Sequence, residues 1–291
     1  MNDLHKRALL YGNAVLVLSG LGVAWANRAT HADVLTLLSS ANVQLGMAFV
    51  LPPTDEHGRA LETRETLIAS AEQSLGIVEQ IQPGMATTTE FRGFAHRLRG
   101  RYAEAAACFR QARQCADFDR TQHAVLAFNE ARMLAAAGNR QAALEVLGAN
   151  KAQIDVQYHS ERLLEEASML RQLGRRVEAE HHLDEVVRQT GASAMAWVEA
   201  GREFLQLGHL DKAEAAFEHA RPDEPIADYH LARLKLQQGA VDSCCELLTR
   251  ASKARPAEVR RMLRDEAEAW SAVSADAWFR QLTTPAAAPG R

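Results

Sequence analysis

The fold of this chain is decided by residues 197–225, which read WVEAGREFLQLGHLDKAEAAFEHARPDEP. Two sets of small and apolar positions recur there at helical spacing, and they are Trp197, Gly201 and Phe204, then Ala213, Phe217 and Ala220. Gly208 lies between the two sets and Pro225 follows the second. The pattern predicts two helices joined by a turn at Gly208, with Pro225 ending the second helix.

This hairpin resembles a tetratricopeptide repeat (TPR), whose signature is W-x2-L-G-x2-Y, then A-x3-F, then P. The chain departs from the signature at two positions, since Ala200 stands for the Leu and Phe204 for the Tyr. One repeat cannot bury its own apolar face, so the resemblance predicts neighbouring repeats.

Four further segments carry equivalent positions at a spacing near the roughly 34 residues of this repeat. Their defining residues are Gly93, His96, Gly100, Ala105, Phe109 and Ala112; Ala131, Leu134, Gly138, Ala143 and Leu147; Ala167, Leu170, Gly174, Ala179 and Leu183; and Ala232, Gly239, Cys244, Leu248, Ala251 and Pro256. The spacing stretches at residues 115–119 and 150–157, and Gly191 stands where a closing Pro is usual. We predict five TPR units over residues 87–256, in an all-α superhelical solenoid of antiparallel helix pairs.

The composition agrees with a helical solenoid and argues against a nucleic-acid partner. Ala, Leu, Glu, Arg and Gln are abundant, and aromatic residues make up 6% of the 291 residues. The formal net charge is −4. A nucleic-acid-binding domain is normally strongly basic, so we expect none here.

Residues 1–28 are predicted to be a membrane anchor or signal segment. Ala8 to Ala26 carries no charge and is long enough, at about 19 residues, to cross a bilayer core as a helix. Lys6 and Arg7 outnumber Arg28, which favours a single-pass protein with an extracytoplasmic (periplasmic) repeat domain. Two alternatives stay open. The Ala24-Trp25-Ala26 pattern fits signal cleavage and secretion, and a buried first helix would suit a cytoplasmic protein.

Residues 29–86 are predicted to form a divergent helical pair, either an N-terminal cap or an eroded repeat. We expect Ala32–Leu51 to pair with Leu61–Gln82. Val34–Leu51 is uncharged and could instead be a second membrane span. Polar residues recur every four positions there, at Thr36, Ser40 and Gln44. Such a stripe favours packing on protein.

The C-terminal end is predicted to close the solenoid. Residues 257–282 have a charged outer face and an apolar inner face containing Val259, Leu263 and Trp270, as a terminal capping helix requires. Trp278 and Phe279 are expected to pack back on it. Residues 283–291 are expected to be a disordered tail.

No pattern of catalytic or metal-binding residues emerges from the sequence. The nucleotide-binding, nucleophile-elbow and metalloprotease motifs are absent. The four cysteines occupy positions that suit core packing, and His181 and His182 are interpreted as solvated surface because neighbours on a helix diverge. We therefore expect a protein that is not an enzyme, with no cofactor, metal or small-molecule substrate.

The resemblance places the binding surface on the first helix of each unit, which lines the concave groove in TPR proteins. The positions it implies are Phe94, Arg97, Phe128, Asn129, Arg132, Leu164, Arg171, Val198, Arg202, Leu205, Tyr229, Arg233 and Leu236. Each unit contributes an Arg beside apolar residues, a composition that suits a peptide or protein partner with acidic groups. Asn129 lies where clamp-type TPR domains keep a carboxylate-binding Asn, but the rest of the clamp is missing.

These patterns predict a non-catalytic scaffold that captures a peptide or partner protein in its concave groove while tethered to a membrane through Ala8 to Ala26. An alternative is a stoichiometric structural or accessory subunit of a larger membrane complex. The glycines and Asn13 of the first segment suit helix contacts in lipid, as such a subunit would need.

Overall fold

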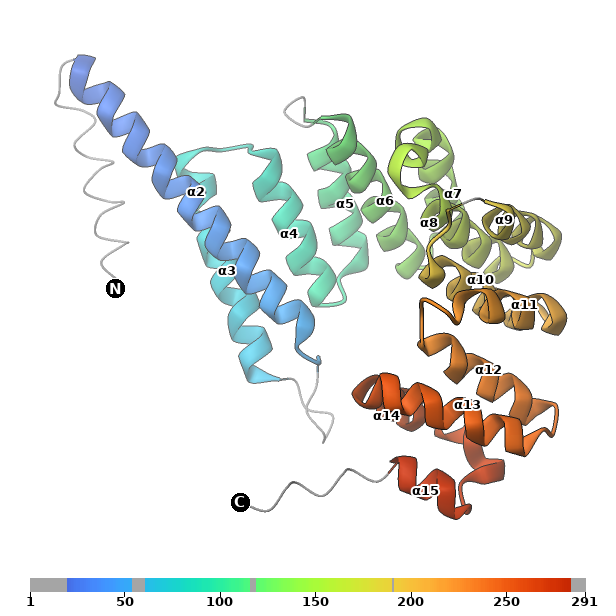
Figure 1. Ribbon diagram of the computed structural model, residues 1–291. Coiled ribbons are helices and arrows are strands. Elements are labelled where there is room, and N and C mark those ends of the chain that lie inside the picture. Colours follow the sequence, from blue (N-terminus) through green and yellow to red (C-terminus); the bar gives the residue numbers. More distant parts are fainter. Residues whose placement is uncertain (1–19, 54–60, 116–118, 190, 284–291) are drawn as a thin grey trace, which may run out of the picture. The chain divides into compact units, whose positions relative to one another are not determined.

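The computed structural model describes residues 20–53, 61–115, 119–189 and 191–283 (Figure 1). Within these ranges the regular elements are helices, and no strand occurs. The chain is an all-α solenoid of antiparallel helix pairs, as predicted. It divides into an N-terminal unit, residues 1–154, and a C-terminal unit, residues 155–291, which are described in turn.

The N-terminal unit contains three successive helix pairs (Figure 1). The pairs are α2 (Gly20–Val50) with α3 (Glu62–Ile81), α4 (Ala86–Leu98) with α5 (Tyr102–Arg113), and α6 (Arg120–Ala136) with α7 (Arg140–Ala149). Small residues let the paired helices approach closely. A Cβ atom built on Gly93 would lie 2.9 Å from Cε1 of Phe109 on the partner helix, so only glycine fits there.

The C-terminal unit continues the same architecture and ends in shorter helices. Its elements are α8 (Lys151–Gln172), α9 (Arg176–Arg188), α10 (Ala194–Leu207), α11 (Leu210–Ala220), α12 (Ile226–Gln237), α13 (Val241–Ala254), α14 (Pro256–Asp265), the 3-10 helix η1 (Ala267–Val273) and α15 (Ala277–Thr283). Tyr158 interrupts α8 with non-helical backbone angles, φ −128° and ψ 34°. The extra residues at 150–157 thus form additional helical turns ahead of the kink, which explains the stretched spacing.

The sequence dictates the ends of α10, the helix on which the fold prediction rests. Ser193 caps its N-terminus by accepting a hydrogen bond from the Ala196 backbone N–H at 3.1 Å. Gly208 ends it in the left-handed conformation, with φ 85°, which carries little steric cost for glycine. Phe204 between these ends is 1% exposed and belongs to the core.

Helix α2 begins earlier than expected and is continuous. It runs without a break through Arg28, where the boundary between the anchor segment and the helical pair was predicted. No Pro or Gly occurs between Asn27 and Asp33 to interrupt it. The first part of the predicted anchor, residues 8–19, lies outside the described residues.

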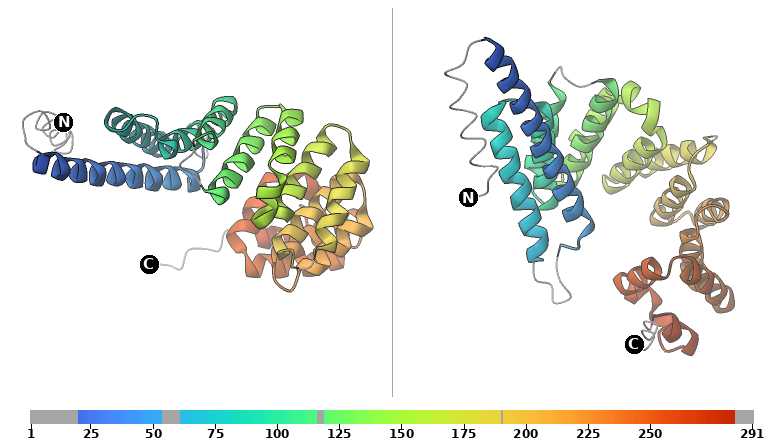
Figure 2. Two further views of the ribbon diagram at one scale, coloured as in Figure 1. Left: turned by 90° about the horizontal axis from the view of Figure 1, so that it is seen from above. Right: turned by 60° about the vertical axis from the view of Figure 1, so that its left-hand side comes forward.

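Helices α2 and α3 lie side by side (Figure 2, right), and the inner face of α2 packs on α3 from Val34 to Ala48. The residues of this shared core are Val34, Leu37, Leu38, Ala41, Leu45 and Ala48 from α2, with Ile68, Ala71, Leu75 and Val78 from α3. Buried Arg64 secures the end of the pair by donating hydrogen bonds to the carbonyl oxygens of Ala48 (3.1 Å) and Leu98 (2.6 Å). Of the polar residues expected to face protein, Gln44 donates to Ser70 Oγ at 2.9 Å, whereas Ser40 is exposed.

Within the described residues, one helix is long and apolar enough to cross a membrane, at Asp33–Val50 of α2. A third of that window is buried against the rest of the chain, and core helices of soluble proteins and signal sequences share these properties. The finding is compatible with a membrane anchor or a signal sequence near the N-terminus.

The C-terminal helices close the last pair with an apolar layer. Val259, Leu263 and Trp270 are at most 3% exposed, and the rings of Trp270 and Phe279 stack with centroids 5.9 Å apart. The region predicted to hold the capping helices contains α14, which ends at Asp265, followed by η1 and α15. Residues 284–291, expected to be a disordered tail, lie outside the described part of the chain.

Candidate functional site

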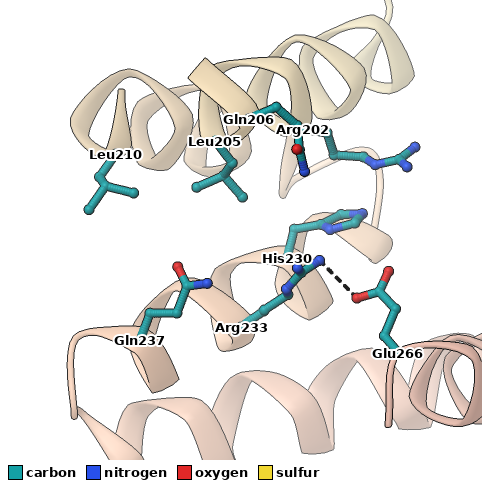
Figure 3. A pocket seen from close by; sticks show the side chains of 8 residues that line it. All are labelled: Arg202, Leu205, Gln206, Leu210, His230, Arg233, Gln237 and Glu266. Atoms are coloured by element: carbon teal, nitrogen blue, oxygen red, sulfur yellow. Dashed lines mark hydrogen bonds and ion pairs between the residues drawn. The ribbon is translucent and has the colours of Figure 1, made fainter. Parts of the chain in front are cut away.

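A pocket of about 370 Å³ lies between α10 and α12 of the C-terminal unit (Figure 3). Its lining residues are Arg202, Leu205, Gln206, Leu210, His230, Arg233, Gln237 and Glu266. Figure 3 shows the α10 side chains on one side and the α12 side chains on the other, with Glu266 reaching in from the residue after α14. The lining therefore combines two guanidinium groups with two leucines and two amides.

The Arg233 side chain forms an ion pair in the pocket, but one of its hydrogen-bond donors has no partner. Its Nη1 donates to Glu266 Oε2 at 2.8 Å. Glu266 also accepts from the Tyr229 hydroxyl at 3.2 Å, which in turn accepts from Trp270 Nε1 at 3.1 Å. The Nε atom of Arg233 is buried and has no hydrogen-bond partner. A buried donor without a partner costs free energy.

His230 is a neutral side chain beneath the two arginines. It is 3% exposed, and its ring stacks on Phe217 with centroids 5.2 Å apart and an interplanar angle of 16°. Burial, helped by the charges of Arg202 and Arg233, lowers the pKa of His230 to about 3. The pocket thus carries no histidine charge at neutral pH, and its cations are the two arginines.

Arg202 differs from the equivalent arginines of the neighbouring units. Arg171 Nε donates to Glu203 at 2.7 Å, so it is paired with an acid of the next unit, as Arg233 is with Glu266. Glu203 and Glu266 lie 32 and 33 residues after their arginines. The residues at these distances after Arg202 are Leu234 and Lys235, and neither is acidic. Arg202 instead pairs with Glu199 of its own helix at 2.9 Å, and the Arg202 side chain is 51% exposed. Such exposed pairs are weak, so its guanidinium is available to a partner.

The α10–α11 hairpin beside this pocket is where a known family matches. Residues 194–220 match the model of the tetratricopeptide repeat. The hairpin formed by α10 and α11 is therefore similar to a tetratricopeptide repeat.

Two solved structures are similar to this chain. The crystal structure of the APC/C hetero-tetramer Cut9-Hcn1 matches with a TM-score of 0.50 and 14% identity, over 90% of this chain and 46% of that chain. A TPR protein from Parabacteroides merdae ATCC 43184 matches with a TM-score of 0.48 and 17% identity, over 84% and 98% of the two chains. This chain thus spans less than half of the first of these proteins. No curated protein matches the sequence.

The pocket brings together three of the predicted groove residues, Arg202, Leu205 and Arg233. Leu164, Arg171 and Leu236 are half-buried outside its lining. Val198 and Tyr229 are at most 1% exposed, so their side chains support the TPR surface from beneath.

The remaining predicted groove residues lie in the N-terminal unit. Phe94 packs edge-on against Phe109 with centroids 5.1 Å apart, and the Arg97 guanidinium lies 5.2 Å from the centroid of the Phe49 ring. Burial, and then the charge of Arg132, lower the pKa of Arg97. Phe128 and Asn129 are half-buried and Arg132 is exposed.

The sequence analysis did not predict five of the lining residues, which are Gln206, Leu210, His230, Gln237 and Glu266. His230 and Gln237 flank Arg233 at helical spacing, so the register of the TPR units could have suggested them. Glu266 had no such signal, because it follows the last repeat and reaches the pocket only through the packing of α14.

The other histidines and cysteines considered in the sequence analysis lie outside this pocket. His182 is half-buried, and its Nδ1 lies 3.7 Å from Glu166, so the interpretation of His182 as solvated surface is wrong, while neighbouring His181 is exposed. The cysteines are free thiols, with Cys244 buried. Within the described residues, no group of three or more His, Cys, Asp or Glu side chains could hold a metal ion.

Proposed function

We propose that this TPR protein is a non-catalytic interaction scaffold that captures an acidic segment of a partner protein at the pocket between α10 and α12. The observation that carries the proposal is the presence of two guanidinium groups in one pocket lining, those of exposed Arg202 and of Arg233, beside neutral His230. Guanidinium groups bind carboxylates through charge-assisted hydrogen bonds. A glutamate or aspartate of the partner binds these guanidinium groups.

The other lining residues suit a peptide more than a small anion. Leu205 and Leu210 provide apolar contact area, and the amides of Gln206 and Gln237 can both donate and accept hydrogen bonds to a backbone. An extended or helical segment with one acidic side chain between apolar ones uses all three kinds of contact.

The lining argues against chemistry at this pocket. It contains no serine, threonine, cysteine or lysine that could act as a nucleophile. His230, with a pKa lowered to about 3, is a weak base. Binding without reaction is the function that these side chains support.

We further propose that a membrane tether, with the repeats on the periplasmic side, is formed by Ala8 to Ala26 and not by Val34–Leu51. Helix α3 packs along the inner face of the second segment and carries Glu65 and Glu72. These carboxylates pair with Arg99 on the α4 side, and a bilayer around α2 would have to accommodate them too.

A second candidate function, a stoichiometric subunit of a larger membrane complex, is favoured by one observation. The outer face of α2 exposes several large apolar side chains, among them Val43 and Met47. A stable partner that covers such a face is held by apolar contact and tolerates salt, whereas capture by arginines weakens as salt rises.

The test is a binding titration with synthetic peptides. Helical peptides with one central Glu between leucines are compared with their Gln counterparts on the wild-type chain and on the charge-reversed variant R202E/R233E. We expect the Glu peptides to bind the wild type about tenfold or more tightly than the Gln peptides, and the variant to lose that preference.

The matched control reverses two exposed charges away from the pocket, K253E/R261E. It changes the net charge equally and should leave the preference intact. Equal binding of Glu and Gln peptides by the wild type would refute capture of an acidic segment. Recovery of one salt-resistant partner in equimolar amount from detergent-solubilised membranes would support the second candidate instead.

A further inference from the structure

The backbone of Glu266 is fixed where this residue enters the pocket, between α14 and η1. Its N–H donates to the carbonyl oxygen of Met262 at 2.9 Å, and its own carbonyl oxygen accepts from the N–H of Ala269 at 2.9 Å. The side chain of Glu266 is 30% exposed. Movement of the carboxylate out of the pocket therefore requires only a rotation of this side chain.

Two donors converge on one oxygen of the Glu266 carboxylate. Oε2 accepts from Arg233 Nη1 at 2.8 Å and from the Tyr229 hydroxyl at 3.2 Å. The Tyr229 hydroxyl in turn accepts from Trp270 Nε1 at 3.1 Å. The direction of these bonds is fixed, because an indole N–H can only donate and a carboxylate can only accept. Trp270 thus aims the hydroxyl proton of Tyr229 at Glu266.

Tyr229 and Trp270 act from outside the pocket. Both side chains are fully buried, their ring centroids lie 5.4 Å apart, and neither residue lines the pocket. Burial raises the pKa of Tyr229, so its hydroxyl keeps the proton that it donates. Trp270 also stacks on Phe279, with centroids 5.9 Å apart. The hydroxyl therefore holds the carboxylate from a rigid position.

Glu266 and a carboxylate of a partner would compete for Arg233. Glu266 already occupies Nη1 of Arg233, whereas Arg202 on the other side of the pocket is paired only with Glu199 of its own helix. A ligand that must first displace an internal group has an apparent affinity reduced by the fraction of molecules in which that group has left. Whatever holds Glu266 in place thus lowers the affinity of the pocket for an acidic segment.

We infer that Tyr229, itself held by Trp270, is a positioning residue that keeps the Glu266 carboxylate on Arg233 and so closes the pocket until an acidic segment displaces it. The inference rests on the proposed function, since it concerns the regulation of the same pocket. It gives a role to two buried side chains that do not touch the partner.

The first test asks whether the hydroxyl holds the carboxylate, and it needs no partner. Urea unfolding of the full chain, followed by tryptophan fluorescence, is measured for the wild type, Y229F, E266Q and the double variant. We expect the double variant to lose less stability than the sum of the two single losses, because both substitutions break the same hydrogen bond. Additive losses would show that the hydroxyl does not act on Glu266 and would overturn the inference.

The second test measures the affinity of the same four chains for the Glu peptides. Y229F is expected to bind them about threefold more tightly than the wild type, although it is less stable. The double variant should bind no more tightly than E266Q alone, because the hydroxyl acts only through Glu266. A merely structural role of Tyr229 would lower the stability without raising the affinity.

The matched control is Y102F, which removes a hydroxyl from an exposed tyrosine of the N-terminal unit. It should bind the peptides like the wild type. If the wild type prefers Glu peptides and Y229F binds them no more tightly, this inference alone is refuted. If the wild type shows no such preference, the proposed function fails and the inference fails with it.

The third test detects the displacement itself through the indole N–H signals of a chain labelled with ¹⁵N at tryptophan. The Trp270 signal, assigned with W270F, should shift on addition of a Glu peptide, because its acceptor Tyr229 then loses the bond to Glu266. The signal of Trp278, whose N–H donates to Asp276, should stay in place. A Trp270 signal that does not move at saturating peptide would mean that Glu266 stays on Tyr229, and would overturn the inference.

Discussion

A Cβ atom placed on Gly201 would lie 2.5 Å from Cε1 of Phe217, closer than real side chains approach. Phe217 is fully buried, and on its other side it stacks on His230 of the next helix pair. The absent side chain at Gly201 thus lets Phe217 fill the space between α10 and α11 and reach the base of the pocket. Packing within one repeat and the position of a pocket residue in the next are linked through this ring.

Gly201→Leu is expected to destabilise the C-terminal unit by about 3 kcal/mol, because buried Phe217 has no room to yield. The comparison is Gly76→Leu in α3, where a Cβ meets open space and the change should cost nothing or stabilise the helix by up to about 1 kcal/mol. Urea unfolding followed by the fluorescence of Trp197, Trp270 and Trp278 measures the first variant, and circular dichroism the second. Unchanged unfolding of Gly201→Leu would show that this contact is wrong.

The stability of the C-terminal unit should fall in mild acid because of His230. Its pKa is about 3 in the folded chain, whereas an unfolded histidine titrates near its ordinary value of 6.5. Between these values the unfolded chain binds a proton that the folded chain does not, so stability is lost as the pH drops below 6.5. From pH 7.5 to pH 5 the loss from this one group is about 2 kcal/mol.

His230→Phe should remove that part of the pH dependence while keeping the stack on Phe217. The measurement is urea unfolding at pH 7.5 and pH 5 for both chains. Other groups titrate equally in the two chains, so the difference between their pH responses isolates His230. Parallel pH responses would mean that this side chain is not held neutral.

The repeat architecture could be predicted from the sequence because its determinants are local. The turn after α10 requires Gly208, and buried Phe217 requires a small residue opposite it at position 201. Both requirements appear in the sequence as small residues at a fixed spacing. The continuity of α2 through Arg28 was not predicted, because the sequence analysis divided this stretch into an anchor segment and a separate helix, although no Pro or Gly between Asn27 and Asp33 interrupts it.

The pocket was predictable only in part. Arg202 and Arg233 follow from the register of the repeats, because each occupies the same place on its first helix. The register does not predict which of the two guanidinium groups is free to bind a partner. That depends on whether an acidic side chain of the following helices lies within hydrogen-bond distance, as Glu266 does for Arg233. That acid comes from beyond the repeats, where no periodic pattern constrains its position.

Removing an arginine partner of the buried Glu130 carboxylate should destabilise the N-terminal unit more than removing the carboxylate itself. Glu130 is 1% exposed and accepts from Arg110 at 2.7 Å and from Arg113 at 2.9 Å, while the arginines are 50% and 25% exposed. Arg113→Met leaves a buried charge with half its partners and should cost about 3 kcal/mol. Glu130→Met removes the buried charge and leaves arginines that water can solvate, so the cost should be below about 1 kcal/mol. Urea unfolding followed by circular dichroism gives the order, and equal or reversed costs would contradict it.

Glu266 should act as an internal competitor for the acidic partner. Its carboxylate occupies Nη1 of Arg233 and lines the same pocket, so it takes one donor and repels a second carboxylate. Glu266→Gln is expected to tighten binding of the Glu peptides by roughly threefold to tenfold, since the full guanidinium charge then serves the ligand. The stability cost should stay below about 1 kcal/mol, because both partners of the ion pair are about 30% exposed. Glu268→Gln changes the net charge equally on an exposed neighbour and should leave the affinity unchanged. If both variants gain affinity alike, the effect is one of net charge, and Arg233 is not the residue that receives the partner.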